Sequence, residues 1–239
     1  MSFLKLFQQH SWQGMTDRIY NKNETDVEMV LAKQGNRDLD DFCTLVSPAA
    51  TPYLEAMAQQ SHDLTRKRFG NTTQLYIPLY LSNECHNICT YCGFSVDNKI
   101  KRLTLNHEQI MAEVEEIKSH GFEHVLLVTG EANRTVGVDY LSQVCDWLRP
   151  HFSSISLEVQ ALEQEDYEQL INHGLNSVMI YQETYHQTNY QQYHPKGKKR
   201  NFEYRLDTPD RLGKAGIHRI GLGALLGLED WRVDSSFVA

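Results

Sequence analysis

The sequence predicts an α/β fold: a TIM-type barrel of βα units that stops after about five units, preceded by a helical N-terminal extension. Residues 1–72 show helical periodicity without strand alternation, whereas residues 73–239 alternate between short apolar runs and amphipathic segments. Such a repeat is typical of a parallel sheet with right-handed crossovers. We therefore expect two domains, a helical extension over residues 1–72 and an incomplete barrel core over residues 73–239.

One helix of the extension has clear boundary signals. Ser47 is a good capping residue, and Pro48 follows at the first helical position, where a missing N–H costs little. Gly70 supplies a stop signal. The pattern predicts one continuous helix from Ser47 to about Phe69.

Strands and helices alternate through the barrel core. The predicted strands cover residues 74–81, 123–129, 155–160, 177–182 and 217–226. The predicted helices cover residues 104–120, 138–149, 163–173 and 202–215. Functional groups of a TIM-type barrel lie at the carboxyl ends of its strands. The loops that follow these strands are therefore where a site is expected.

The last part of the sequence, from Asp234 to Ala239, has the pattern of another helix opening. About five βα units do not close an eight-stranded barrel, and an uncovered last strand leaves a sheet edge that invites association. We expect a fragment or a prematurely ended reading frame, in which further barrel strands and their substrate contacts are missing.

The composition limits the kinds of partner. The chain has 239 residues and a formal net charge of −8, which argues against nucleic acid because phosphate binding relies on lysine and arginine. The basic run at residues 196–200 is explained most simply as a solvated loop, although an anionic partner fits it as well. No apolar stretch is long enough for a membrane span and no signal-peptide pattern is present. We therefore expect a cytoplasmic protein without membrane attachment.

The most informative motif is C-x3-C-x2-C, formed by Cys85, Cys89 and Cys92 with Tyr91 before the third cysteine. Three neighbouring thiolates are one short of the four ligands usual for a cubane iron–sulfur cluster, which leaves one iron open for catalysis. Zinc is the alternative, but its fourth ligand would have to be His86, which is awkwardly placed beside the first cysteine. The other two cysteines lack paired spacing, so a disulfide framework is not favoured.

Further polar residues fall near the ends of the other predicted strands. Thr129-Gly130-Glu131 follows the second strand, Glu158 lies within the third, and Gln182-Glu183 follows the fourth. The segment from Gly227 to Asp230 follows the fifth. A glycine turn with a solvated glutamate explains the Thr129-Gly130-Glu131 triplet alone, and a tightly packed strand with small residues explains the glycine-containing segment Gly223–Asp230 alone. Their shared position at one end of the strands is the stronger indication of a common ligand site.

The cysteine motif, with its aromatic residue before the third cysteine, resembles the signature of the radical S-adenosylmethionine (SAM) superfamily. The resemblance implies a [4Fe–4S] cluster on these three cysteines, with SAM chelating the open iron. Arg205 lies in a stretch similar to biotin synthases, whose arginine contacts the SAM carboxylate; an ion pair on a helix surface is the alternative. The implied SAM-binding residues are Tyr91 near adenine, Gly130 and Glu131 at the amino group, Arg205 at the carboxylate, and Glu158 and Glu183 as weaker candidates.

A narrower resemblance is to the aromatic amino-acid lyases of this superfamily, and among them to the tyrosine lyases of thiamine biosynthesis. It rests on the segments Pro78–Asn83, Cys92–Phe94, Tyr181–His186 and Gly221–Leu225. The resemblance implies cleavage of the Cα–Cβ bond of L-tyrosine to p-cresol and 2-iminoacetate (dehydroglycine), which feeds the thiazole of thiamine. It also implies an electron donor such as flavodoxin or ferredoxin, and a thiazole synthase subunit as partner. Tyr80 is the candidate substrate contact, with core packing as the alternative, and no catalytic residue is assigned.

Two alternatives stay open at this point. One is the tyrosine lyase of hydrogenase maturation, which makes carbon monoxide and cyanide. Gly197-Lys198-Lys199 and the segment from Leu206 to Pro209 favour the thiamine type modestly. The other alternative is an inactive fragment, or a metal-binding module without catalysis, because part of the barrel is missing.

Overall fold

The computed structural model describes residues 2–239 and divides them into two compact units. The sheet unit consists of residues 2–4, 75–182 and 187–223; the helical unit consists of residues 5–74, 183–186 and 224–239. Two segments therefore pack with the helical unit although they are distant from it in the sequence. The domain boundary expected between residues 72 and 73 stays a prediction.

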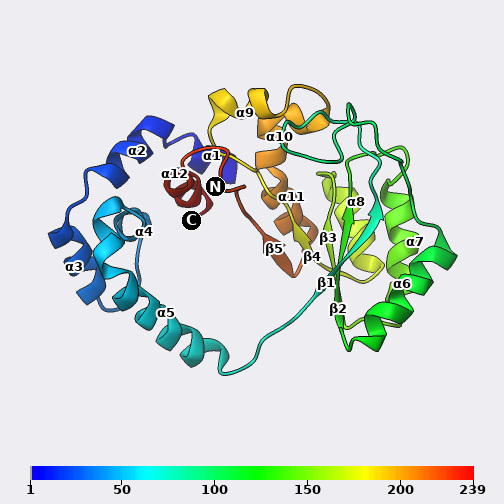
Figure 1. Cartoon of the computed structure of the whole chain (residues 1–239), viewed down its shortest axis with the longest axis horizontal. Coiled ribbons are helices and arrows are strands. Elements are labelled where there is room, and N and C mark those ends of the chain that lie inside the picture. Colours follow the sequence, from blue (N-terminus) through cyan, green and yellow to red (C-terminus); the bar gives the residue numbers. More distant parts are fainter. Residues whose placement is uncertain (1) are drawn as a thin grey trace. The chain divides into compact units, whose positions relative to one another are not determined.

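Within residues 2–239, five strands form one parallel sheet in the order β1-β2-β3-β4-β5 (Figure 1). The strands are β1 (Ile77–Ser82), β2 (His124–Thr129), β3 (Ser154–Glu158), β4 (Leu175–Met179) and β5 (Arg219–Gly221). Each connection leads to the next neighbouring strand, as in the wall of a TIM-type barrel. The predicted fold class is confirmed, and β1 and β5 are the edges of this sheet.

Among the described residues, four helices that follow strands or precede them pack in a row. They are α6 (His107–Ser119), α7 (Val138–Leu148), α8 (Gln164–Asn172) and α11 (Thr208–Ala215). Right-handed crossovers between sequential parallel strands put such helices on one face of the sheet. Accordingly α6 contacts α7, α7 contacts α8, and α8 contacts α11.

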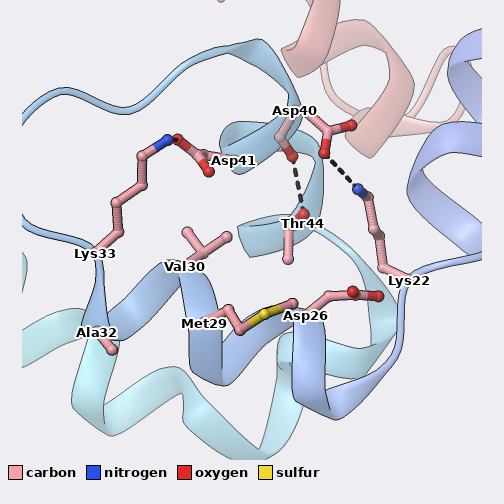
Figure 2. A pocket seen from close by; sticks show the side chains of 9 residues that line it. All are labelled: Lys22, Asp26, Met29, Val30, Ala32, Lys33, Asp40, Asp41 and Thr44. Carbon is pink, nitrogen blue, oxygen red and sulfur yellow. Dashed lines mark hydrogen bonds and ion pairs between the residues drawn. The ribbon is translucent and has the colours of Figure 1, made fainter.

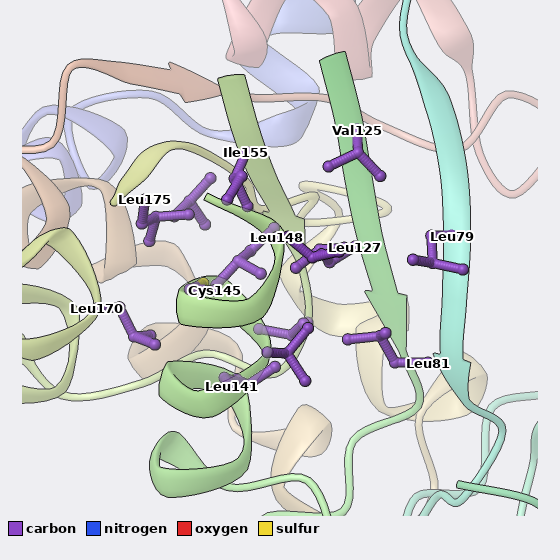
Figure 3. Close-up of a cluster of buried hydrophobic side chains, with 14 of the residues drawn as sticks. Leu79, Leu81, Val125, Leu127, Leu141, Cys145, Leu148, Ile155, Leu170 and Leu175 are labelled. Carbon is purple, nitrogen blue, oxygen red and sulfur yellow. The ribbon is translucent and has the colours of Figure 1, made fainter. Parts of the chain in front are cut away.

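The core lies between these helices and the sheet (Figure 3). Leu79 and Leu81 of β1 enter it, whereas Tyr80 between them is exposed. Leu127 of β2 and Leu148 of α7 are fully buried in the same cluster. Burying each such leucine side chain contributes about 1.5–3 kcal/mol. The core therefore fixes the strands side by side and brings the loops after them to one edge of the sheet.

The helix predicted over residues 202–215 is divided in two. Helix α10 (Phe202–Leu206) ends before Asp207, and α11 starts with proline in its first turn. Pro209 has no N–H to donate to the carbonyl oxygen of Arg205, so one continuous α-helix is interrupted there.

The fifth strand is much shorter than the predicted run 217–226. Strand β5 has three residues, and beyond it Ala224 forms only an isolated bridge with Glu183. The glycine-rich sequence after Gly221 has few side chains that pack on a pleated surface, which weakens strand formation. The short elements α9 (Gln187–Tyr193) and η2 (Lys198–Arg200) were not predicted at all.

The helical character expected of the N-terminal part is confirmed. Its α-helices are α1 (Phe3–Phe7), α2 (Trp12–Tyr20), α3 (Glu24–Ala32), α4 (Leu39–Leu45) and α5 (Leu54–Phe69). The side chains of Ser11, Asn23 and Asp38 accept backbone N–H groups at the starts of α2, α3 and α4. None of the helices in the described part of the chain has both the length and the apolar character required to span a bilayer.

The continuous helix predicted from Ser47 is wrong over its first six residues. These residues form the 3₁₀ element η1 (Pro48–Tyr53), and the α-helix begins only after it. Pro52 lacks the N–H for an α-helical bond to the carbonyl oxygen of Pro48. Ser47 precedes the element but forms no side-chain capping bond.

The helix expected from Asp234 onward is α12 (Trp231–Val238), which begins earlier than predicted. The Asp234 side chain is buried, and its Oδ1 accepts hydrogen bonds from Thr184 Oγ1 at 3.0 Å and from the Tyr185 N–H at 2.7 Å. Burial raises the pKa of Asp234 to about 6 despite these two donors. Helix α12 thus fastens residues 183–186 within the helical unit.

We predict that Asp234→Asn stabilises the protein at about pH 8 and has little effect near pH 4. Because the pKa of Asp234 is higher in the folded state than the unfolded value of about 3.9, ionisation of this group destabilises the fold. The cost is complete above about pH 7 and disappears as the pH falls through about 6 toward 4. It amounts to roughly 2–3 kcal/mol. Thermal unfolding of both proteins across this pH range measures it.

Asp63→Asn, at an exposed position of α5, is the matched control. It should change the free energy of unfolding by less than about 0.5 kcal/mol at any pH. A gain for Asp234→Asn that is equal at both ends of the pH range would contradict the prediction.

Candidate active site around the cysteine loop

The cysteine loop, residues 83–98, follows β1. Cys85 and Cys89 are buried in it, and Cys92 is half-buried. Two backbone N–H groups point at sulfur: the Asn87 N–H donates to Cys85 Sγ at 3.5 Å, and the Phe94 N–H donates to Cys92 Sγ at 3.4 Å. Hydrogen bonds to sulfur are among the features that set the potential of protein-bound iron–sulfur clusters.

Arg102 closes the loop at both ends and was missed from the sequence. Its Nη1 donates to the carbonyl oxygens of Asn83 and Phe94, and its Nη2 donates to that of Ser95 at 2.8 Å. The sequence offered only an arginine ten residues after the last cysteine of the motif, with no spacing rule that marks it. The guanidinium group holds the loop in a closed conformation because one planar fork satisfies several carbonyl groups.

The loop after β2 meets the cysteine loop at Gly130. A Cβ at this position would lie 2.2 Å from the carbonyl oxygen of Glu84 and 3.1 Å from the Cβ of Cys85, so only glycine fits. The next residue, Glu131, accepts a hydrogen bond at its carbonyl oxygen from the His86 N–H at 3.0 Å. Glycine therefore allows the backbones of these two predicted site segments to touch.

Glu131 and Arg205 form an ion pair across the sheet unit. Arg205 Nη1 lies 2.7 Å from Glu131 Oε1, and the two side chains are only 7% and 13% exposed. Arg205 Nε also donates to the carbonyl oxygen of Tyr181 at 2.6 Å. The alternative of a surface ion pair within one helix is therefore excluded for Arg205.

Glu131 is held in its ionised form. Burial alone would raise the pKa of this carboxyl, but the charges of Arg205 and Lys199 and a hydrogen bond from Asn87 outweigh burial and lower the pKa below its ordinary value. A carboxylate and a guanidinium side by side present one negative and one positive group, which is the complement of an amino acid's ammonium and carboxylate.

The Tyr91 side chain contacts His194, the residue that directly follows α9. Its hydroxyl lies 2.6 Å from Nε2 of the fully buried His194, and the two rings meet edge to face. His194 Nδ1 lies 2.9 Å from the carbonyl oxygen of Tyr190, which can only accept, so Nδ1 carries a proton. In the neutral ring Nε2 then accepts from Tyr91. His194 was not identified from the sequence.

The remaining predicted residues are placed differently from one another. Tyr80 is 57% exposed and packs edge to face against Phe94 of the cysteine loop, and its role as a substrate contact stays a prediction. Glu158 is the last residue of β3 and lies opposite Val128 of β2. Glu183 belongs to the helical unit, where it adopts φ of 72° and its carbonyl oxygen accepts from the Leu225 N–H at 2.7 Å.

A cavity of about 530 Å³ in the helical unit contains none of the predicted site residues (Figure 2). Four of its charged groups form two ion pairs within the unit. Lys22 Nζ lies 2.7 Å from Asp40 Oδ2, and Lys33 forms an ion pair with Asp41. No predicted site residue lines this cavity, and we assign no ligand to it.

The donor set of the cysteine loop suits a cluster better than one zinc ion. His86, the only nearby candidate for a fourth zinc ligand that the sequence suggested, is exposed, whereas the flanking cysteine is buried. Within residues 2–239, no three His, Cys, Asp or Glu side chains converge tightly enough for a single ion. A cubane cluster does not require the three thiolates to converge on a single ion, because each thiolate binds a different iron.

Burial raises the pKa of the Cys89 thiol to about 11, so metal loading must release its proton.

Comparison with known families decides the assignment. A family model of the radical SAM superfamily matches residues 79–235, which include the whole cysteine loop, Glu131 and Arg205. The chain belongs to the radical SAM superfamily. Membership implies a [4Fe–4S] cluster and SAM as cofactors. Three thiols in one loop, with backbone N–H groups aimed at two of the sulfurs, fit the cluster.

Among curated relatives, this radical SAM chain is 52% identical over 239 residues to a 2-iminoacetate synthase from Salmonella typhimurium. It is 53% identical over 240 residues to a 2-iminoacetate synthase from Escherichia coli. Both comparisons cover 100% of this chain and 63% of the relative. The chain therefore spans about 63% of the length of these curated relatives.

Among solved structures, the chain is similar to the FeFe-hydrogenase maturase HydG from Carboxydothermus hydrogenoformans. The TM-score is 0.88 at 27% sequence identity, and the comparison covers 99% of this chain and 56% of that chain. The likeness extends over both the helices and the sheet of the chain and supports the TIM-type radical SAM fold.

We predict that Gly130→Ala lowers iron incorporation during anaerobic reconstitution and destabilises the protein by about 1–3 kcal/mol. The added methyl group meets the carbonyl oxygen of Glu84 and pushes the cysteine loop away from Glu131. Iron content per chain and thermal unfolding measure the two effects.

Gly213→Ala is the matched control, because a Cβ at this helical position of the same unit meets nothing within 4 Å. It should leave the iron content unchanged and keep or slightly raise stability. Equal iron loss in the two variants would rule out the proposed contact at Gly130.

Proposed function

We propose that the protein to which this chain belongs is a tyrosine lyase of the 2-iminoacetate synthase type. It would cleave the Cα–Cβ bond of L-tyrosine, and the products would be p-cresol and 2-iminoacetate. These two products together hold all atoms of the substrate. The 2-iminoacetate would be used to form the thiazole moiety of thiamine. The observation that carries this proposal is identity of 52–53% to two 2-iminoacetate synthases along the entire chain. At that level the cysteine loop and its surroundings are expected to serve the same chemistry.

In this proposal Cys85, Cys89 and Cys92 hold the cluster. When bound, the cluster and SAM supply the one-electron chemistry that begins hydrogen abstraction from the substrate. The protein's part is to orient the ligands and to exclude water. Burial of two of the three thiols supports this role, because a water-shielded cluster loop protects reactive species from side reactions.

Glu131 and Arg205 would bind the amino-acid end of SAM. The carboxylate of Glu131 would accept from the ammonium group of SAM, and the guanidinium group of Arg205, whose fork suits a carboxylate, would donate to the SAM carboxylate. Their close pairing, at 2.7 Å, supports the assignment because both groups are already ionised and positioned before the ligand arrives. Gly130 would let the protein backbone come close to SAM.

The other predicted residues have lesser roles in the proposal. Tyr91 would lie against adenine with its hydroxyl fixed by His194. Tyr80 would contact the tyrosine substrate, which its exposure supports. Glu158 and Glu183 would make secondary contacts to SAM.

The partners follow from the same proposal. A one-electron donor of the flavodoxin or ferredoxin type would reduce the cluster, and a thiazole synthase subunit would take over the reactive 2-iminoacetate. We place the protein in the cytoplasm, where thiols stay reduced and an oxygen-sensitive cluster survives.

A hydrogenase-maturation activity is the second candidate, because the likeness to HydG extends over 99% of this chain. Identity of 27% to HydG against 52–53% to the 2-iminoacetate synthases favours the thiamine type. The products distinguish the two: carbon monoxide and cyanide accompany p-cresol only in the maturation reaction.

The test is anaerobic reconstitution of the chain with iron and sulfide, followed by incubation with SAM, a reductant and L-tyrosine. We expect roughly four irons per chain, and release of p-cresol and 5′-deoxyadenosine. Replacing Cys85, Cys89 and Cys92 by serine should abolish both cluster and products, whereas Cys145→Ser, at a buried core position, is the control that keeps the cluster.

One zinc ion and no sulfide would refute the cluster assignment. A loaded cluster without p-cresol would instead favour the alternative of an inactive fragment. Carbon monoxide release would favour the maturation type.

A further inference from the structure

Asn87, between the first two cysteines of the loop, joins three separate segments through a single buried side chain. It is 2% exposed, and every polar group of the residue is bonded. Its side-chain Nδ2 donates to Glu131 Oε2 at 2.8 Å, and its Oδ1 accepts from the Lys199 N–H at 3.2 Å. Its carbonyl oxygen accepts from the Val96 N–H at 2.9 Å.

The orientation of this amide is fixed by chemistry. A carboxylate oxygen can only accept, and a backbone N–H can only donate. Nδ2 of Asn87 must therefore face Glu131, and Oδ1 must face Lys199. An aspartate carboxylate could not donate to Glu131, and a side chain without an amide could not both donate to Glu131 and accept from the Lys199 N–H.

The segment around Gly197 is built to receive Asn87. Gly197 adopts φ of 97°, and a Cβ there would lie 1.9 Å from Asn87 Oδ1 and 2.7 Å from Asn87 Cα. The Ile88 N–H donates to the carbonyl oxygen of Lys196 at 3.0 Å, so the backbones are also paired. No other residue type fits at this position without displacing the amide.

These contacts complete a chain of positioned groups. The Gly197 segment holds Asn87, Asn87 holds one oxygen of Glu131, and Arg205 holds the other oxygen. The Glu131 carboxylate thus has one fixed orientation, set from opposite sides by an amide and a guanidinium group. Hydrogen bonds to a charged group contribute more stabilising free energy than hydrogen bonds between neutral groups. Loss of Asn87 or Arg205 should therefore measurably change how firmly the Glu131 carboxylate is held.

We propose that Asn87 is a positioning residue for SAM binding: with Gly197 it locks the Glu131 carboxylate and ties it to the cysteine loop. The inference rests on the proposed role of Glu131 in binding the SAM amino group. It assigns a function to a residue of the cysteine loop that ligates no metal, and a reason for the glycine of the Gly197-Lys198-Lys199 run.

The test measures SAM affinity of the reconstituted full chain, together with iron content and the electron paramagnetic resonance signal of the reduced cluster with and without SAM. Asn87→Ala should weaken SAM binding by about tenfold or more while iron is retained. Asn87→Asp keeps the volume and the acceptor for the Lys199 N–H, loses the donor to Glu131, and should weaken binding at least as much. Gly197→Ala places a methyl group against Asn87 and should also weaken SAM binding.

Asn98→Ala is the matched control. The Asn98 side chain donates to the carbonyl oxygens of Cys92 and Gly93, so it orders the same loop without touching Glu131. Its SAM affinity should stay within about twofold of the parent chain. In a double-mutant cycle, Asn87→Ala should cause little further loss of SAM affinity in a chain that already carries Glu131→Gln. Both substitutions act on the same hydrogen-bonded pair of side chains.

SAM affinity of Asn87→Ala and Asn87→Asp equal to that of Asn98→Ala, with the cluster intact, would overturn the inference. Full additivity with Glu131→Gln would overturn it as well. Absence of p-cresol from a parent chain that binds SAM would bear only on whether this chain is an active lyase or an inactive fragment, and the binding series would still decide the role of Asn87.

Discussion

A carboxylate taken out of water has to be matched by hydrogen bonds and opposite charge, and this requirement organises the site around Glu131. Its side chain is 13% exposed, and its partners come from the cysteine loop, from α10 and, through charge, from the Gly197 segment. The cysteine loop and Glu131 are both far in the sequence from residues 197–206, which supply the two positive charges. Hydrogen bonds and charge on this one carboxylate therefore connect the loop that carries the thiols with Arg205.

The sheet makes this meeting possible. Sequential parallel strands place the loops after β1 and β2 side by side, and glycine at position 130 removes the one atom that would keep them apart. The buried leucines between sheet and helices fix the spacing of the strands. Core packing thus acts on the site indirectly, by setting where the loops start.

Much of the fold could be predicted because it depends on local patterns. The alternation of strands and helices, the glycine stops and the cysteine spacing are all visible in sequence order. The errors lie where proline or glycine changes hydrogen bonding: Pro52 turns a predicted helix start into a 3₁₀ element, and Pro209 divides the helix before β5. Glu183 follows β4 in the sequence, as predicted, and belongs to the helical unit together with residues 224–239.

The sequence by itself determined the chemistry of the protein: three thiols at a spacing suited to a cluster, with a glutamate and an arginine of the right kinds elsewhere in the chain. Tertiary structure alone decided which groups act together. Asn87, His194 and Arg102 carry no spacing signal, because their partners are backbone carbonyls and side chains from other segments. Hydrogen bonds over long sequence separation depend on folded geometry, so only the fold could identify the residues that hold Glu131 and the cysteine loop in place.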